Sequence, residues 1–338
     1  MKKHANIPLF VVHMGCPNQC VFCNQRLISG TSSFSADNAE EQIERALTTL
    51  SGTGRQAEIA FFGGSFTGIE RSLMVRLLDT AQKYVEQGYV SGIRMSTRPD
   101  YISEEIIGII KKYTLSEVEL GIQSMSDSVL ALSRRGHTAD DTRRATKLLR
   151  EAGIDFVGQM MIGLPGSTGA DEICCAGEIC RLGAAGCRIY PTVVFKSTCL
   201  ATMTERGEYA PLSVEEAILR SADVLEVFES YGVRCLRIGL QDSENLHSEE
   251  RYLAGPAHPA LGEMVRGEVF LKRIESRLEA LTEVSEIEVA VPRGKISMAA
   301  GHGGKNKRYI TEKYGIKKIK FNEDETLTGL NVRVTKLR

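Results

Sequence analysis

The chain has 338 residues, of which 42% are hydrophobic and 25% charged, as is ordinary for a soluble globular protein. Its formal net charge of -1 conceals an asymmetry: residues 285–338 hold 12 Lys and Arg against 6 Asp and Glu, while the remainder holds 30 against 37. No stretch approaches the ~20 apolar residues of a membrane span, and Pro8 and His13 interrupt the apolar start of the chain. We therefore expect a cytoplasmic protein without membrane segments, whose basic end favours a polyanionic partner.

Six short apolar runs alternate with amphipathic stretches and are the candidate strands. In chain order they cover residues 7–13, 57–62, 92–96, 117–122, 155–162 and 187–194. The stretch 36–50 places apolar side chains on one helical face, and the stretch 138–153 ends on a helix-stopping glycine. Six strand–helix repeats predict an α/β fold, a partial (β/α)6 barrel whose parallel strands are apolar on both faces. Ligand chemistry then belongs at the carboxyl ends of the strands.

Three cysteines follow the first strand in "GCPNQCVFCNQR" (15–26), namely Cys16, Cys20 and Cys23. A structural zinc site needs four ligands, yet the next cysteine is Cys174 and no histidine lies at pairing distance. In a cubane iron–sulfur cluster, three thiolates leave the fourth iron open to a substrate or cofactor. A zinc knuckle, or three unrelated core cysteines, is the alternative reading.

Polar or glycine-rich motifs follow the next four strands as well. They are "FGGSFTG" (62–68), "STRPD" (96–100), "QS" (123–124) and "GLPG" (163–166). Gly63 and Gly64 expose backbone groups that a small ligand can approach closely. Because all these motifs come at strand ends, we expect them to meet at one edge of the sheet.

The cysteine motif, C-x3-C-x-Φ-C with Phe22 before Cys23, resembles the signature of the radical S-adenosylmethionine (SAM) enzymes. The resemblance implies a 4Fe-4S cluster held by Cys16, Cys20 and Cys23, whose open iron chelates SAM. One electron from the cluster then cleaves SAM to a 5′-deoxyadenosyl radical that abstracts hydrogen from the substrate. Gly63 and Gly64 match the position that holds the cofactor's amino group. Ser65 replaces the usual glutamate there, so contact would be through backbone carbonyls.

Further motifs resemble the radical domain of the catalytic subunit of Elongator, which modifies the wobble uridine of tRNA at C5. These motifs are "STRPDYI", "VELGIQSM", "RRGHT", "GQMMIGLPG" and "RIYPTVVFKSTCL", in this order within residues 5–240. The resemblance implies that Arg98 and Gln123 line the cofactor cleft and that Arg134, Arg135 and His137 lie near its mouth. For the arginines, a solvated helix start is the alternative. Since neither an acetyltransferase domain nor its glycine-rich loop is found, acetyl-CoA is not expected.

Four further cysteines lie close together in the sequence, and an auxiliary cluster is one interpretation of them. They are Cys174, Cys175, Cys180 and Cys187. Their helical periodicity favours the other interpretation, that they fill the core. Beyond the barrel (1–240), residues 241–284 are expected to form a helical connector, with His247 and His258 in loops.

The basic end of the chain, residues 285–338, is predicted to form a small α/β domain that resembles a KH module. Its pattern is strand, short helix, glycine loop, helix and strand, and residues 326–337 would add an edge strand. The loop Gly301-His302-Gly303-Gly304 is a G-x-x-G, and Lys305, Lys307 and Arg308 follow it as phosphate contacts would. Lys307 and Ser297 depart from the KH pattern, so a generic α/β appendage with a basic face is the alternative.

These features predict a radical SAM enzyme that modifies RNA, with a tRNA as the expected substrate and flavodoxin or ferredoxin as the low-potential electron donor. Two other hypotheses remain. One is a small-molecule enzyme of the oxygen-independent coproporphyrinogen oxidase type, although Asn24 stands where that family has an extra cysteine. The other is an RNA-binding protein with a purely structural cluster.

Overall fold

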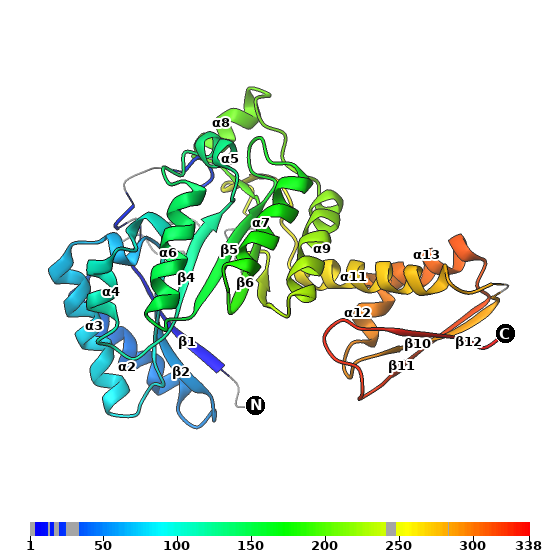
Figure 1. The fold of residues 1–338 in the computed structure, drawn as a ribbon, viewed down its shortest axis with the longest axis horizontal. Coiled ribbons are helices and arrows are strands. Elements are labelled where there is room, and N and C mark those ends of the chain that lie inside the picture. Colours follow the sequence, from blue (N-terminus) through cyan, green and yellow to red (C-terminus); the bar gives the residue numbers. More distant parts are fainter. Residues whose placement is uncertain (1–3, 13, 17–19, 25–33, 241–247, 283) are drawn as a thin grey trace.

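A seven-stranded parallel sheet, curled into a half-barrel, dominates the structure (Figure 1). The computed structural model describes residues 4–12, 14–16, 20–24, 34–240, 248–282 and 284–338. The strands are β1 (His4–Phe10), β2 (Gln56–Phe62), β3 (Ile93–Thr97), β4 (Leu115–Gln123), β5 (Phe156–Ile162), β6 (Gly186–Pro191) and β8 (Arg234–Ile238). They lie side by side in this same order. The predicted partial barrel is therefore confirmed, with β8 as a strand beyond the six expected.

Helices connect successive strands. They are α2 (Ala39–Leu50), α3 (Arg71–Glu86), α4 (Glu104–Ile110), α5 (Asp127–Leu132), α6 (Ala139–Glu151), α7 (Gly169–Arg181), α8 (Cys199–Glu205) and α9 (Val214–Ser230), with short 3-10 turns η1 (Ala36–Asn38), η2 (Phe66–Gly68) and η3 (Pro99–Tyr101). The helices cover the convex face of the sheet, except α5 and α8, which lie at the carboxyl ends of the strands (Figure 1). Capping boxes begin α6, α7 and α9, where Thr138, Thr168 and Ser213 each bond to the acidic residue three positions later.

The two faces of the sheet have opposite character. On the convex face, Ile59 and Leu120 are fully buried against the helices. On the concave face, Arg188 donates to the Glu119 carboxylate at 2.7 Å, and Gln159 donates to the other oxygen of that carboxylate at 2.7 Å. The expectation of strands apolar on both faces is therefore wrong for the middle of the sheet. The helices cover one face only, and buried charges on the other are tolerated because they pair with each other.

Residues 194–195 and 252–254 form a separate two-stranded antiparallel sheet, β7 (Val194–Phe195) with β9 (Tyr252–Ala254). The expected connector thus contains a short strand as well as one long helix, α11 (Leu261–Leu278). In the described part of the chain, no helix is both long and apolar enough to cross a membrane.

The C-terminal region is a three-stranded sheet with two helices on it (Figure 1). Its elements are β10 (Glu286–Val291), α12 (Ile296–Ala300), η4 (His302–Gly304), α13 (Lys305–Tyr314), β11 (Lys318–Glu323) and β12 (Arg333–Lys336). Strand β10 pairs in parallel with β11 and antiparallel with β12. Helix α11 packs on α9 on the barrel side and on α12 and α13 on the other, so one continuous core joins the two regions.

Candidate cluster and cofactor site

The cysteine loop follows β1 at the carboxyl edge of the sheet. Cys20 is buried, Cys16 and Cys23 are half-buried, and none of the three forms a disulfide in the described part of the chain. The Cys23 backbone N–H donates to the Cys20 carbonyl at 3.0 Å, so these two cysteines share a tight turn. Residues 17–19 lie outside the described residues. Within the described residues, no three His, Cys, Asp or Glu side chains are close enough to hold a metal ion.

The glycine motif after β2 packs backbone to backbone against this loop. A Cβ added to Gly64 would lie 2.5 Å from the carbonyl oxygens of both Met14 and Val11. A Cβ added to Gly15, whose φ is +70°, would lie 2.2 Å from the Ser65 carbonyl oxygen. The Ser65 N–H closes the contact by donating to Met14 O at 3.1 Å. Only glycine fits where the two loops approach each other this closely.

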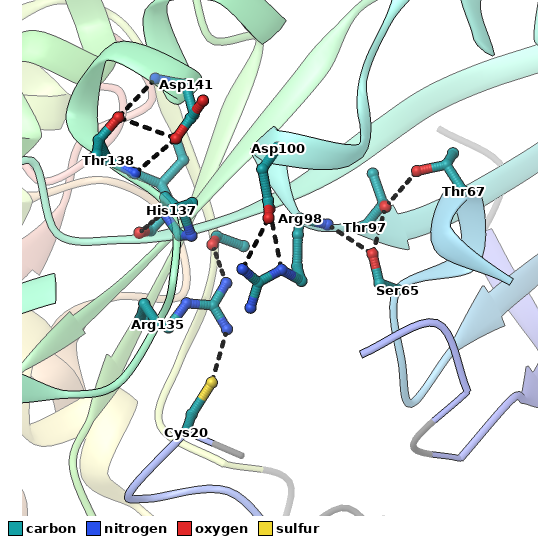
Figure 2. A network of polar contacts seen from close by, with 12 residues as sticks. Cys20, Ser65, Thr67, Thr97, Arg98, Asp100, Arg135, His137, Thr138 and Asp141 are labelled. Carbon is teal, nitrogen blue, oxygen red and sulfur yellow. Dashed lines mark hydrogen bonds and ion pairs between the residues drawn. The ribbon is translucent and has the colours of Figure 1, made fainter. Parts of the chain in front are cut away.

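Ser65 is fully buried, and its side chain fastens the glycine loop to the end of β3 (Figure 2). Its Oγ lies 2.9 Å from Thr97 Oγ1 and accepts the Arg98 backbone N–H at 3.2 Å. Thr67 Oγ1 lies 2.6 Å from Thr97 Oγ1 and donates to the Tyr101 carbonyl at 2.9 Å. The Ser65 hydroxyl thus has structural partners within the protein, and contact of this loop with a cofactor through its backbone stays a prediction.

Two buried arginines flank the cysteines, and their guanidinium groups face each other (Figure 2). Arg98 is paired with Asp100 through two hydrogen bonds, whereas Arg135 donates to Cys20 Sγ at 3.3 Å. Burial and the neighbouring Cys20 raise the pKa of the Cys16 thiol, while both guanidinium groups and a backbone hydrogen bond from Ser65 act to lower it. The net effect is a raised pKa, so the two guanidinium groups offset only part of the cost of burying a thiolate at Cys16.

Gln123 and His137 complete this edge of the sheet. Gln123 ends β4 with a φ of 65°, a conformation that costs a non-glycine residue energy and is common at functional sites. The His137 Nε2 lies 3.2 Å from the Ile122 carbonyl. Burial, with Arg135 and Arg98 nearby, lowers the pKa of His137 to about 4, so this imidazole is neutral near pH 7.

Three side chains at this edge carry buried polar atoms without a hydrogen-bond partner: Arg98 through Nη1, Gln123 through Oε1 and His137 through Nδ1. Buried polar groups normally have partners, so a guanidinium donor, an amide oxygen acceptor and an imidazole nitrogen are available to a polar ligand here. Together with the Cys16 and Cys20 thiols beside cationic groups, they suit an anionic iron–sulfur cluster and an amino-acid-bearing cofactor.

The structure therefore brings together Cys16, Cys20, Gly63, Gly64, Ser65, Arg98 and Gln123, the residues that the sequence selected from four different strand ends. The residues of the "RRGHT" motif differ in exposure: Arg135 and His137 are buried within the site, whereas Arg134 is exposed. Sequence reasoning missed Thr67, Thr97 and Asp100. For Asp100, the opposite charge two positions after Arg98 is a signal that could have found it.

The second group of cysteines lies mainly in the core, as the helical periodicity favoured. Cys175, Cys180 and Cys187 are buried among apolar side chains, while Cys174 is exposed. Burial raises the pKa of the Cys175 and Cys187 thiols well above the usual range and that of Cys180 to about 11. Neutral thiols of this kind fill space and are poor metal ligands.

The glycine loop of the C-terminal region lies where this region meets the barrel, because Lys305 Nζ is 3.4 Å from the carboxylate of Glu215 on α9. Gly301, Gly303 and Gly304 all have positive φ, which no other residue type adopts readily. After the loop, Lys305, Lys307 and Arg308 are exposed, while Asn306 points inward and donates to the Gly267 and Ala299 carbonyls at 2.8 and 3.1 Å. His302 is exposed, with its ring 5.7 Å from that of His258 in an edge-on contact. His247 lies outside the described residues.

Comparison with known proteins agrees with this geometry. The sequence profile of the radical SAM superfamily matches residues 10–173, and that of the radical SAM C-terminal domain matches residues 184–270. Protein MJ0486 of Methanocaldococcus jannaschii is 29% identical over 231 residues, which cover 65% of this chain and 71% of that protein. The tRNA uridine(34) acetyltransferase of Methanocaldococcus infernus is 37% identical over 146 residues, but these cover 42% of this chain and only 27% of that enzyme.

Among solved structures, that of Elp3 from Methanocaldococcus infernus, with its first 46 residues deleted, is similar with a TM-score of 0.63 and 27% identity. The match covers 80% of this chain and 64% of that one. The sequence profiles, the Elp3 match and the converging strand-end residues agree. The chain belongs to the radical SAM superfamily of enzymes, and its radical domain is similar to that of the Elongator catalytic subunit.

Proposed function

We propose that this protein binds a 4Fe-4S cluster through Cys16, Cys20 and Cys23, binds SAM beside it, and modifies RNA, with tRNA as the substrate. The observation that carries the proposal is the convergence of the cysteine loop with two buried arginines, one of which contacts Cys20 Sγ directly. A zinc knuckle is not proposed, because a structural zinc site needs four protein ligands and the next cysteine after Cys23 is Cys174.

When bound, the reduced cluster and SAM supply a 5′-deoxyadenosyl radical that abstracts a hydrogen atom from the substrate. The residues of this chain bind and orient the cofactor. The buried Arg98 offers a donor through Nη1, and Gln123 offers an acceptor through Oε1. Gly63 and Gly64 bring the loop backbone against the cysteine loop, and we propose that backbone groups of this loop hold the amino group of the cofactor. His137, neutral near pH 7, adds no charge to the site.

RNA is proposed as the substrate on two grounds. One relative is named a tRNA uridine(34) acetyltransferase and is 37% identical to this chain over 146 residues. In addition, the exposed Lys305, Lys307 and Arg308 follow a glycine loop at a helix N-terminus, an arrangement suited to a phosphate backbone. Transfer of an acetyl group is not proposed, because the match covers only 27% of that enzyme. A low-potential donor such as flavodoxin or ferredoxin would reduce the cluster.

Anaerobic reconstitution with iron and sulfide tests the cofactor proposal. With SAM and dithionite, the wild-type protein should form 5′-deoxyadenosine, and Cys20→Ala should abolish that product. Cys174→Ala removes an exposed cysteine outside the site and should leave both the iron content and the product unchanged. A wild-type protein that takes up zinc but no iron–sulfur cluster would refute the proposal.

Salt-dependent tRNA binding by the full-length chain tests the substrate proposal. The double variant Lys307→Ala, Arg308→Ala should weaken binding and reduce the slope of log K against log salt by about 0.7 per lost phosphate contact. Lys111→Ala, Lys112→Ala removes the same charge from an exposed turn after α4 and serves as the control. Equal effects of the two pairs would show that the C-terminal loop does not bind the backbone, and would favour a small-molecule substrate.

A further inference from the structure

Arg135 is held so that its guanidinium has little freedom to leave the cysteine loop. It is 7% exposed, and its Nη2 donates to the Gly121 carbonyl at 2.5 Å while Nη1 donates to Cys20 Sγ at 3.3 Å (Figure 2). One end of this planar group is therefore anchored to β4 and the other end is directed at a sulfur. A guanidinium can bridge two acceptors in fixed geometry, which a lysine ammonium cannot do in the same way.

The backbone around Arg135 reinforces that position. Its N–H donates to the Leu130 carbonyl at 2.9 Å, and the preceding Arg134 adopts a φ of 51°, which turns the chain sharply after α5. The Ser133 carbonyl accepts the Val21 N–H at 3.1 Å, so this turn is bonded directly to the cysteine loop. The turn and the loop are thus connected through the backbone, with Arg134 exposed to solvent and Arg135 in contact with Cys20.

Gly121 also helps to position the Arg135 guanidinium, because its carbonyl accepts the hydrogen bond from Nη2. A Cβ at this position would lie 3.2 Å from Arg135 Nη2 and 3.1 Å from Gln123 Nε2. A side chain at position 121 would therefore crowd Arg135 and Gln123. Because glycine has none, the Arg135 guanidinium can reach the Gly121 carbonyl.

A hydrogen bond to a ligating sulfur changes the energetics of adding an electron. A 4Fe-4S cluster with three thiolates is already anionic in its oxidised form, and reduction adds one more negative charge. A cationic donor at the sulfur stabilises the reduced form more than the oxidised form, and hydrogen bonds to sulfur are among the factors that set cluster potentials.

We propose that Arg135 is a positioning residue that raises the reduction potential of the cluster through its contact with Cys20 Sγ, so that a low-potential electron donor can reduce it. This inference rests on the proposed function, since it requires the cluster at Cys16, Cys20 and Cys23. The step is a single electron passed from the donor to the oxidised cluster, with no bond broken and no proton transferred.

A redox titration of the reconstituted full-length protein, followed by EPR of the reduced cluster without SAM, tests the inference. Arg135→Met should shift the midpoint potential to more negative values, and Arg135→Lys should shift it less, because the charge stays while the two-point geometry is lost. Arg134→Met removes the same charge from the exposed neighbour and should leave the potential nearly unchanged. The EPR line shape should also change in Arg135→Met, because the sulfur loses its donor.

Equal potentials in the wild type and Arg135→Met, at equal iron content, would overturn the inference, as would equal shifts in the Arg134 and Arg135 variants. If Arg135→Met takes up no iron, Arg135→Lys and Arg135→Gln decide the matter. Loss of iron in all three would assign Arg135 to cluster assembly and refute the tuning role. A wild-type protein without any cluster would instead refute the proposed function, so the two failures are distinguishable.

Discussion

The Arg98 guanidinium and the Asp100 carboxylate meet through two parallel hydrogen bonds, each 2.9 Å long. Arg98 is 3% exposed, whereas the Asp100 side chain retains 23% exposure. Asp100 therefore neutralises a buried charge beside the cysteine loop and fixes the plane of the guanidinium, leaving Nη1 directed elsewhere.

Replacing Asp100 by alanine should destabilise the fold markedly, because the Arg98 charge would remain buried without its carboxylate. We expect the free energy of unfolding to fall by about 3 kcal/mol in urea titrations. Asp140→Ala breaks the exposed pair with Arg143 and should cost less than about 1 kcal/mol. Similar losses in the two variants would mean that Asp100 does not compensate a buried charge.

Gly64→Ala should disturb the cysteine loop itself. The new methyl group would meet two carbonyl oxygens at 2.5 Å, and backbone cannot move aside as a flexible side chain can. We expect lower iron incorporation on reconstitution, together with reduced thermal stability. Gly108→Ala is the matched control, because a Cβ in the middle of α4 meets nothing within 4 Å and should stabilise the helix by up to about 1 kcal/mol. Full iron content in Gly64→Ala would contradict the close packing of the two loops.

The sequence predicts those parts of the site that depend on local patterns, and it does not predict contacts between residues far apart in the chain. The motifs after β1 to β4 could be assigned to one edge because parallel strands end together, and local periodicity is enough to identify such strands. Strand β8 was not predicted because its sequence, "RCLRI", includes two arginines and lies at an edge of the sheet, where it stays partly exposed. A strand of this kind lacks the continuous apolar run that marked the others.

Side-chain direction was harder to predict than location. Arg134 and Arg135 are identical in type and adjacent, yet one is exposed and the other contacts Cys20. That difference comes from the positive φ of Arg134 and from the Gly121 carbonyl, which is 14 residues away in sequence. The charged concave face has the same origin, because Glu119 and Arg188 are paired across 69 positions. Local patterns do not encode such partners.

The buried carboxylate of Glu172 holds the loop that follows β5, and the effect of this contact on stability can be tested. It is 2% exposed, and its carboxylate accepts the Gly163 N–H at 2.6 Å and the Arg220 guanidinium at 2.5 and 2.9 Å. Burial raises the pKa of Glu172, while Arg220 and the hydrogen bonds act to lower it. Arg220→Met should therefore cost about 3 kcal/mol near neutral pH, because it leaves a buried carboxylate without its cation.

The loss of stability in Arg220→Met should increase with pH. Without Arg220, the pKa of Glu172 rises further, so the folded state binds more protons than the unfolded state above the ordinary carboxyl pKa. Stability of Arg220→Met should then fall as the pH rises, and the loss relative to wild type should be larger at pH 8 than at pH 5. The exposed Arg143→Met, which breaks a surface pair with Glu178, should show a small loss at both values. An equal loss for Arg220→Met at pH 5 and pH 8 would exclude a titrating Glu172.

His137 should make the fold sensitive to acid in a separate range. Its folded pKa of about 4 lies below the ordinary value of 6.5, so between these values the unfolded state binds more protons. The stability that this group contributes is complete above pH 6.5 and is lost as the pH falls toward 4. At 1.36 kcal/mol per pH unit, wild type should lose about 2 kcal/mol between pH 7 and pH 5 from this group alone.

His137→Gln keeps a donor for the Ile122 carbonyl and should remove that part of the pH dependence, whereas His302→Gln, on the exposed loop, should retain it. Parallel stability curves for wild type and His137→Gln across this range would show that the imidazole is not buried in its neutral form.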